Sequence, residues 1–243
     1  MGKKELTILA RGHGWVVVAK PPRLVVHHNE HSRGAYPALQ RVRDQLGCSV
    51  YPIHRLDAAA SGCLLFGTDR DAAGVLAGAL GRGEKTYVAL VRGVCGEPSS
   101  VDVQRPLRDD NGIIKEARTL LSCAARSREP PCSLVVARPV TGRYHQIRRH
   151  LRGLSHPIIG DRQHGDKQVN RLWREHRGVD RLALHCLSIT FQAPDGGRVE
   201  ATCPLFDDMA TSLRQLPFFD EVARKLPALG AAALPRNARA EAL

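Results

Sequence analysis

A single carboxylate in a loop of small side chains is the feature of this sequence best suited to chemistry. Asp57 follows Ile53-His54-Arg55-Leu56 and precedes three alanines, Ser61 and Gly62. Side chains of this size leave room for a substrate to approach closely, and Arg55 could contact a phosphate or the substrate itself. An ionised carboxylate in such a place can act as a nucleophile or a base. The structural alternative is that Asp57 accepts backbone N–H groups in a tight turn.

Positive charge is concentrated further along the chain. The sequence has 36 Lys and Arg against 24 Asp and Glu, a formal net charge of +12. Between Arg138 and Arg181, eleven Lys or Arg stand against four acidic residues. Charge of this density is typical of proteins that bind polyanions, and we expect this zone to contact phosphates. A solvated helix face with scattered charge is the alternative.

The histidines do not predict a metal site. His27, His28 and His31 match no common ligand spacing. On a helix, His145 and His150 would lie about 140° apart, so they would not converge as an i, i+4 pair does. The sequence also has no Gly-x-Gly-x-x-Gly, Walker-type or His-Glu-x-x-His motif. The spacings therefore predict no metal site, and the missing motifs give no indication of a cofactor.

These residues must be positioned by an α+β fold with a mostly antiparallel sheet, because short β-branched runs outnumber the helical patterns. Strands are expected over 15–19, 62–68, 86–91, 134–137, 182–191 and 198–203, and helices over 35–46, 69–80, 145–153 and 207–216. Thr68 is expected to open the second helix, with Asp71 three residues later. The turn Asp195-Gly196-Gly197 predicts a hairpin, and residues 126–132 a loop.

Composition favours one catalytic domain over residues 1–226, with a disordered tail over 227–243 that is rich in alanine and proline. Seven cysteines without a Cys-x-x-Cys pair indicate neither a disulfide framework nor a zinc ribbon, which fits a reducing cytoplasm. No apolar stretch has the length of a signal peptide or a membrane span, so we expect neither secretion nor a membrane partner.

Several ordered motifs over residues 6–206 resemble those of the RluA-type pseudouridine synthases. They are Trp15–His27, His54–Asp57 with Ser61-Gly62, Lys85–Ala89, Thr141–Arg148, His156–Asp161 and Leu182–His185. The chain departs from the usual pattern at Ala58 and Ala60, and at Pro22-Arg23, where hydroxyl or cationic contacts would be lost. The resemblance implies the pseudouridine synthase fold, a long bent mixed sheet with flanking helices and a central active-site cleft.

The same resemblance implies roles for individual residues. Asp57 would be the catalytic carboxylate, Tyr87 would stack on the target base, and Arg148 would pair with the carboxylate. Such a pairing keeps an aspartate ionised at neutral pH. Arg55 would help to displace the uridine from its stack, at a cost of a few kcal/mol that an aromatic face can largely offset. Further substrate contacts are expected from the motif residues His54, Arg143, His145, Gln146, Ile147 and Leu184.

The implied activity is the isomerisation of uridine in structured RNA, which requires no redox or group-transfer cofactor. The run Leu154–Arg171 is similar to the branch that modifies uridine 65 of transfer RNA, although ribosomal RNA stays an alternative substrate. No obligate protein partner is implied. Two other functions stay open: an RNA-binding protein without turnover, and a His- or Asp-dependent nuclease or phosphohydrolase. The second would need converging metal ligands or a pair of histidines, and the spacings supply neither.

Overall fold

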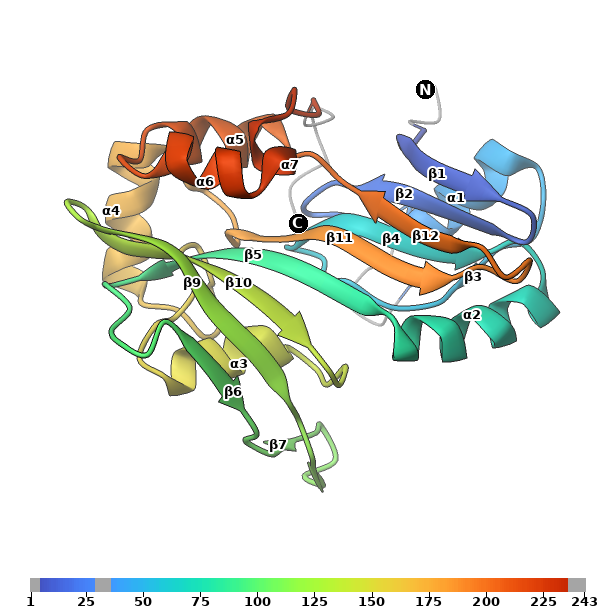
Figure 1. Ribbon diagram of the computed structural model, residues 1–243, viewed down its shortest axis with the longest axis horizontal. Coiled ribbons are helices and arrows are strands. Elements are labelled where there is room, and N and C mark those ends of the chain that lie inside the picture. The colour runs from blue at the N-terminus through green and yellow to red at the C-terminus, as the bar shows by residue number, and fades with distance from the viewer. Residues whose placement is uncertain (1–4, 29–35, 236–243) are drawn as a thin grey trace. The chain divides into compact units, whose positions relative to one another are not determined.

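The computed structural model of the protein describes residues 5–28 and 36–235. The described chain divides into two compact units, each built from segments distant in sequence (Figure 1). The first unit contains the residues up to Glu84 and the segment Cys186–Cys203. The second contains Lys85–His185 and Pro204–Leu234. None of the helices in these described ranges is long and apolar enough to cross a membrane.

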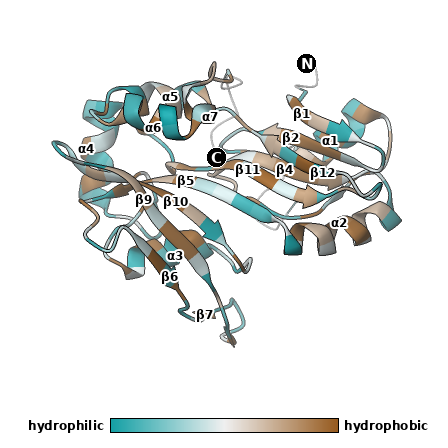
Figure 2. Ribbon diagram, in the orientation of Figure 1, coloured by the Kyte–Doolittle hydropathy of each residue, from teal (hydrophilic) through white to brown (hydrophobic). Residues whose placement is uncertain are grey.

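The strands of the first unit are hydrogen-bonded in the order β1-β2-β4-β11, with β3 on β4 and β12 on β11. They are β1 (Ile8–Gly12), β2 (Trp15–Lys20), β3 (Tyr51–Pro52), β4 (Ser61–Gly67), β11 (Leu184–Gln192) and β12 (Arg198–Thr202). Every residue of β2 and β4 is buried, which explains their continuous apolar runs, seen as brown segments in Figure 2. The predicted hairpin is confirmed, because β11 and β12 pair in antiparallel register around a turn with Gly196 at φ +87°.

Two helices belong to the first unit, α1 (Ala38–Leu46) and α2 (Arg70–Arg82). The prediction that Thr68 opens α2 is wrong by one residue. Asp69 is the N-cap, and its carboxylate accepts the backbone N–H of Ala72 at 2.7 Å. Aspartate is at least as good a cap as threonine, and its side chain reaches the free N–H groups of the first turn. Residue 35, the expected start of α1, lies outside the described residues.

The second unit has an antiparallel sheet in the order β5-β10-β9-β6 and a separate two-stranded ribbon, β7-β8. The strands are β5 (Glu84–Arg92), β6 (Ser100–Val103), β7 (Leu107–Arg108), β8 (Ile114–Lys115), β9 (Thr119–Arg128) and β10 (Pro131–Pro139). The expected loop over 126–132 is wrong for most of its length. Strands β9 and β10 extend through it, and Arg128 pairs with Pro131.

Five helices of the second unit are described: α3 (Gln146–Gly153), α4 (Lys167–Arg177), α5 (Asp207–Arg214), α6 (Phe219–Lys225) and α7 (Pro227–Gly230). Helix α3 contacts β9 and β10, and α5, α6 and α7 follow one another closely, as the red ribbons of Figure 1 show. Leu229 of α7 is buried, and the backbone of Leu234 bonds to Leu205 and Asp207. The expectation of disorder from residue 227 onward is therefore wrong for 227–235, and residues 236–243 lie outside the described part.

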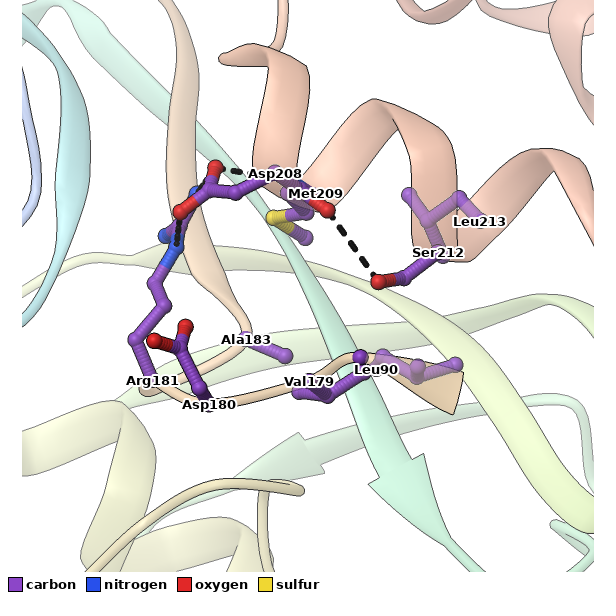
Figure 3. A pocket seen from close by; sticks show the side chains of 10 residues that line it. Leu90, Val179, Asp180, Arg181, Ala183, Asp208, Met209, Ser212 and Leu213 are labelled. Carbon is purple, nitrogen blue, oxygen red and sulfur yellow. Dashed lines mark hydrogen bonds and ion pairs between the residues drawn. The ribbon is translucent and has the colours of Figure 1, made fainter. Parts of the chain in front are cut away.

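A buried ion pair fastens α5 to the segment that leads into β11. Arg181 bonds through Nε and Nη2 to the carboxylate of Asp208 at 3.0 Å each, and both side chains are nearly inaccessible. Figure 3 shows this pair beside a small cavity of about 10 Å³, lined also by Leu90, Ala183 and Met209. This volume is at the lower limit for holding one water molecule. The α+β class predicted from the sequence is confirmed.

Candidate functional site

Asp57 lies in the loop between β3 and β4 of the first unit. Its side chain is half-buried, and its carbonyl accepts the N–H of Ala60 at 3.0 Å, which closes a turn over the alanines. Arg55, two residues earlier, is exposed. The loop thus contains a tight turn, but the main-chain carbonyl of Asp57 closes it, and the residue is partly exposed. The alternative role of the carboxylate as an acceptor of backbone N–H groups stays open.

Lys20 anchors this loop through a hydrogen bond to Ala58, and sequence reasoning did not select it as a site residue. Its side chain is fully buried at the end of β2. The ammonium group donates to the carbonyls of Pro21 at 2.9 Å, Leu24 at 2.8 Å and Ala58 at 3.2 Å. Buried charge is stable only when hydrogen bonds replace its water, and three carbonyls do so here. The sequence signal that could have revealed Lys20 is its place as a charged residue at the end of a continuous apolar strand.

Two residues of the motif around Asp57, His54 and Gly62, have structural roles in the first unit. His54 accepts the N–H of Leu65 on β4 through Nε2 at 3.2 Å. Gly62 has φ +118°, and a Cβ built on it would lie 2.2 Å from the carbonyl oxygen of Cys186 in β11. The missing side chain of Gly62 therefore makes room for a neighbouring strand. The sequence interpretation had assigned that room to a substrate.

Tyr87 occupies the centre of β5 in the second unit. It lies opposite Ala137 of β10, and only 7 % of it is exposed. The predicted tyrosine strand is thus confirmed as a strand. The assignment of the ring as a stacking surface for the base stays a prediction.

Arg148 forms a buried, two-point ion pair with Asp161. Its Nε and Nη2 donate to the two carboxylate oxygens at 2.7 Å and 2.8 Å, and Nη2 also reaches Gln163. Asp161 accepts the N–H groups of Gln163 and His164 as well. Burial by itself would raise the pKa of Asp161, but the bonds from Arg148 and from the backbone lower it below its usual value. Asp161 is therefore an ionised residue that fixes the direction of the guanidinium.

Gln146 holds the loop over residues 141–145, which precedes α3, against β9. Its Oε1 accepts from the hydroxyl of Thr141 at 2.6 Å and from the N–H of Arg143 at 3.0 Å. Its Nε2 donates to the carbonyl of Arg118 and the hydroxyl of Thr119, each at 2.9 Å. Both N–H groups and both lone pairs of the amide oxygen are therefore used by protein groups. Gln146 thus explains how the loop before α3 keeps its shape.

His145 is in a strained backbone conformation at the start of α3. It has φ +52°, which is uncommon for a residue other than glycine. Its ring stacks on Tyr144, with centroids 3.7 Å apart, and its Nδ1 lies 3.0 Å from Nε2 of His164. Such strain is maintained only where the surroundings fix it, and two ring contacts do so here.

The remaining predicted residues of the second unit divide into exposed and buried. Arg143 is exposed, and its Nε donates to the carbonyl of Glu116 at 2.9 Å. Ile147 and Leu184 are buried and belong to the core. Asp57, Arg55 and His54 lie in the first unit, and the other predicted residues lie in the second. The convergence of Asp57 with Tyr87 and Arg148 stays a prediction.

The described residues give no sign of a metal-binding cluster, since nowhere among them do three or more His, Cys, Asp or Glu side chains gather in a suitable arrangement. The loop carries the half-buried Asp57, and the buried ammonium group of Lys20 bonds to the carbonyl of the next residue, Ala58.

Comparison with known proteins gives a consistent result. A sequence profile described as RNA pseudouridylate synthase matches residues 14–152, a range that includes Asp57, Tyr87 and Arg148. The chain is 37% identical to tRNA pseudouridine synthase C of Pasteurella multocida over 210 residues, which are 78% of this chain and 86% of that protein. The protein of the same name from Vibrio cholerae is 34% identical over 212 residues, with the same coverage.

The fold has counterparts among solved structures. Human RNA Pseudouridylate Synthase Domain Containing 4 matches with a TM-score of 0.68 at 24% identity, over 86% of this chain and 92% of that one. Human RNA Pseudouridylate Synthase Domain Containing 1 matches with a TM-score of 0.65 at 23% identity, over 97% of this chain and 98% of that one. The predicted pseudouridine synthase fold is confirmed. The chain is an RNA-modifying isomerase and belongs to the RNA pseudouridylate synthase family.

Proposed function

We propose that the protein isomerises uridine to pseudouridine in transfer RNA, at uridine 65, with Asp57 as the catalytic carboxylate. The observation that carries the proposal is the 37% identity, over most of both chains, with an enzyme named tRNA pseudouridine synthase C. The choice of uridine 65 is supported by the run Leu154–Arg171. Within it, Asn170 bonds to Gly160 and Asp161, which holds the loop that carries His164.

The reaction exchanges one bond of the ribose for another. The bond from C1′ to N1 of uracil breaks, the base turns, and a bond from C1′ to C5 forms. A proton leaves C5 and a proton is gained at N1, so that substrate and product are isomers. Asp57 begins this sequence as a nucleophile or a base, which requires that it be ionised. The half-buried position of Asp57 suits direct contact with a nucleotide.

Arg148 and Tyr87 act on the same step. Arg148 stabilises the ionised form of Asp57, and its own orientation is set by the buried carboxylate of Asp161. Tyr87 stacks on the displaced base and thereby offsets roughly 1–3 kcal/mol of the cost of unstacking it. The activity belongs in the cytoplasm, where transfer RNA is modified.

The decisive experiment incubates the purified protein with unmodified transfer RNA and maps pseudouridine by carbodiimide-stop sequencing, with ribosomal RNA in parallel. Wild type and Asp57→Asn are compared with Asp71→Asn, which removes a charge of the same kind from an exposed position on α2. We expect a mark at position 65 from wild type and Asp71→Asn, and none from Asp57→Asn.

Each other outcome corrects a different part of the proposal. A mark only in ribosomal RNA would keep the chemistry and overturn the substrate. A mark made by Asp57→Asn at the wild-type rate would overturn the catalytic role of Asp57. Binding without any mark, from all three proteins, would favour an RNA-binding protein without turnover.

A further inference from the structure

A groove lined with arginines crosses one face of the second unit. Its volume is about 710 Å³, and its charged lining consists of Arg105, Arg108, Arg149 and Arg152, with His164 beside them. Two elements build it: the segment that enters β7 supplies Arg105 and Arg108, and α3 supplies the other two arginines. The sequence placed Arg149 and Arg152 in its basic zone, but Arg105 and Arg108 lie about thirty residues before the start of that zone at Arg138.

No carboxylate in the described part of the chain forms an ion pair with these four side chains. Among the described residues, none of them forms an ion pair. Arg108 donates to the carbonyl of Gly112 at 2.8 Å, and Arg149 donates to the carbonyl of Arg108 at 2.9 Å. Asp109, the acidic residue next to Arg108, is already paired with Lys115 at 2.7 Å. As far as residues 5–28 and 36–235 are concerned, the groove is therefore a concentration of positive charge without a paired carboxylate.

The two sides of the groove are fixed to one another by a buried histidine. His150 of α3 contacts the carbonyl of Arg105 through Nε2 at 3.0 Å and the hydroxyl of Thr119 through Nδ1 at 2.9 Å. Because a carbonyl can only accept, Nε2 carries the proton in this contact. Burial first, and then the charges of Arg105 and Arg149, lower the pKa of His150. The histidine thus stays neutral and holds the backbone of Arg105 against α3.

The absence of a side chain at Gly153 lets the guanidinium group of Arg105 lie close to the C-terminal end of α3. A Cβ at Gly153 would lie 2.8 Å from Nη1 of Arg105, so this side chain passes directly over the glycine. The guanidinium of Arg105 therefore lies beside the last residue of α3, and Arg152 precedes that residue on the helix. Like charges that line one groove repel each other, and an anion bound in the groove stabilises them.

We propose that this groove binds the phosphodiester backbone of the RNA substrate, outside the residues predicted to contact the reacting uridine. Guanidinium groups match phosphate oxygens in a two-point geometry. The apolar lining is aliphatic, from residues such as Leu107 and Ile114, so the groove has no broad aromatic surface on which bases could stack. Contacts of this kind position an RNA without reading its sequence. The proposal rests on the proposed function for the identity of the polyanion.

The test is the salt dependence of RNA affinity. Unmodified transfer RNA is titrated with the protein by fluorescence anisotropy between about 50 and 200 mM KCl. The double variant Arg105→Gln/Arg152→Gln should bind roughly tenfold more weakly and lower the log–log salt slope by about two, because two phosphate contacts are lost. The variant Arg105→Lys/Arg152→Lys, which keeps both charges, should retain most of the affinity.

The matched control is Arg128→Gln/Arg214→Gln, which removes the same charge from two exposed positions of the second unit. It should bind within about twofold of wild type. Equal losses in the two glutamine variants would show that only total charge matters and would overturn the proposal, as would wild-type affinity in the groove variant. Thermal unfolding of each variant checks that the fold is intact.

Affinity is measured without turnover, so the two proposals can fail separately. A weakened groove variant together with a wild type that forms no pseudouridine would overturn the proposed function and support the groove. Pseudouridine formation by wild type together with unchanged affinity in the groove variant would overturn the groove alone.

Discussion

The pair between Arg148 and Asp161 is the residue-scale feature with the clearest consequence. Both side chains are buried, and the guanidinium makes two short contacts with one carboxylate. Removal of one charge from such a pair leaves the other uncompensated in a poorly solvated place, which costs about 3–5 kcal/mol. Asp161→Asn should therefore lower the free energy of unfolding by about that amount and slow isomerisation, because Arg148 loses its fixed direction.

Chemical denaturation and single-turnover rates measure the two effects. Asp102→Asn is the control, because Nε and Nη2 of one arginine, Arg118, also donate to the carboxylate of Asp102, but at the surface. Water screens an exposed pair, so this change should alter stability little and leave the rate unchanged. A similar loss from both changes would contradict the importance given to the buried pair.

Lys20 supports a second prediction at this scale. Lys20→Met keeps the length of the side chain and removes the donor from three carbonyls, one of which belongs to Ala58 beside Asp57. Carbonyls without a partner in a buried place should destabilise the fold by about 2–4 kcal/mol. The loop that carries Asp57 should also loosen, so that isomerisation slows.

The measurements are urea denaturation, single-turnover rates and RNA affinity. Affinity should change little, because a fully buried side chain such as Lys20 is out of reach of the phosphates of a bound RNA. Lys225→Met, at an exposed position on α6, provides the comparison. A folded Lys20→Met protein with the wild-type rate would show that the ammonium group does not position the loop.

At the scale of elements, the contact between β4 and β11 depends on a glycine. Gly62 has φ +118°, and a Cβ there would approach the backbone of Cys186 to 2.2 Å. Gly62→Ala should destabilise the protein by about 3 kcal/mol, because both the backbone strain and the overlap must be relieved. The expected loss appears as a lower urea midpoint.

Gly74→Ala is the matched change. Gly74 lies in the exposed interior of α2, and a Cβ there would meet nothing within 4 Å. Alanine should therefore stabilise this helix by about 0.5–1 kcal/mol. If both alanine variants shifted the midpoint in the same direction, the explanation of Gly62 by close strand approach would be wrong.

Elements with a strong local pattern could be predicted from the sequence, and those held by a few distant contacts could not. The buried runs of β2, β4 and β5 and the turn before β12 were found. Helix α4 was missed because Trp173 is its only buried residue, so its apolar stripe is narrow. Its cap signals were present, since Asp166 accepts two N–H groups at the start and Gly178 adopts φ +69° at the end.

At the scale of the molecule, the predicted site residues belong to two units that are each discontinuous in sequence. Local patterns do not report which distant side chains meet, and so the contacts of Lys20 with Ala58 and of Arg148 with Asp161 were not foreseen. The four arginines of the groove illustrate the same limit. Their convergence depends on how His150 joins α3 to the segment of Arg105.

The pH dependence of stability follows from buried groups of the second unit. Burial is the first cause that lowers the pKa of His150 and of His164 below the ordinary value of 6.5. In the unfolded chain both histidines would titrate near pH 6.5. At pH values between 6.5 and the lower pKa of the folded state, the unfolded state therefore binds more protons than the folded state. The stabilisation is therefore complete above about pH 6.5 and is lost as pH falls through the folded pKa. Asp161, with its pKa below 3.8, adds a further loss only in stronger acid.

Urea midpoints at about pH 8, 6 and 5 test this expectation. Glutamine at position 150 can still donate to the carbonyl of Arg105 and accept from Thr119, but it does not titrate. His150→Gln should therefore lose less stability than wild type as pH falls from about 8 to 5, and His150→Gln/His164→Gln less again. His13→Gln, at an exposed position, should follow the wild-type profile. A profile that is as steep in the double variant as in wild type would mean that other groups carry the acid sensitivity of the second unit.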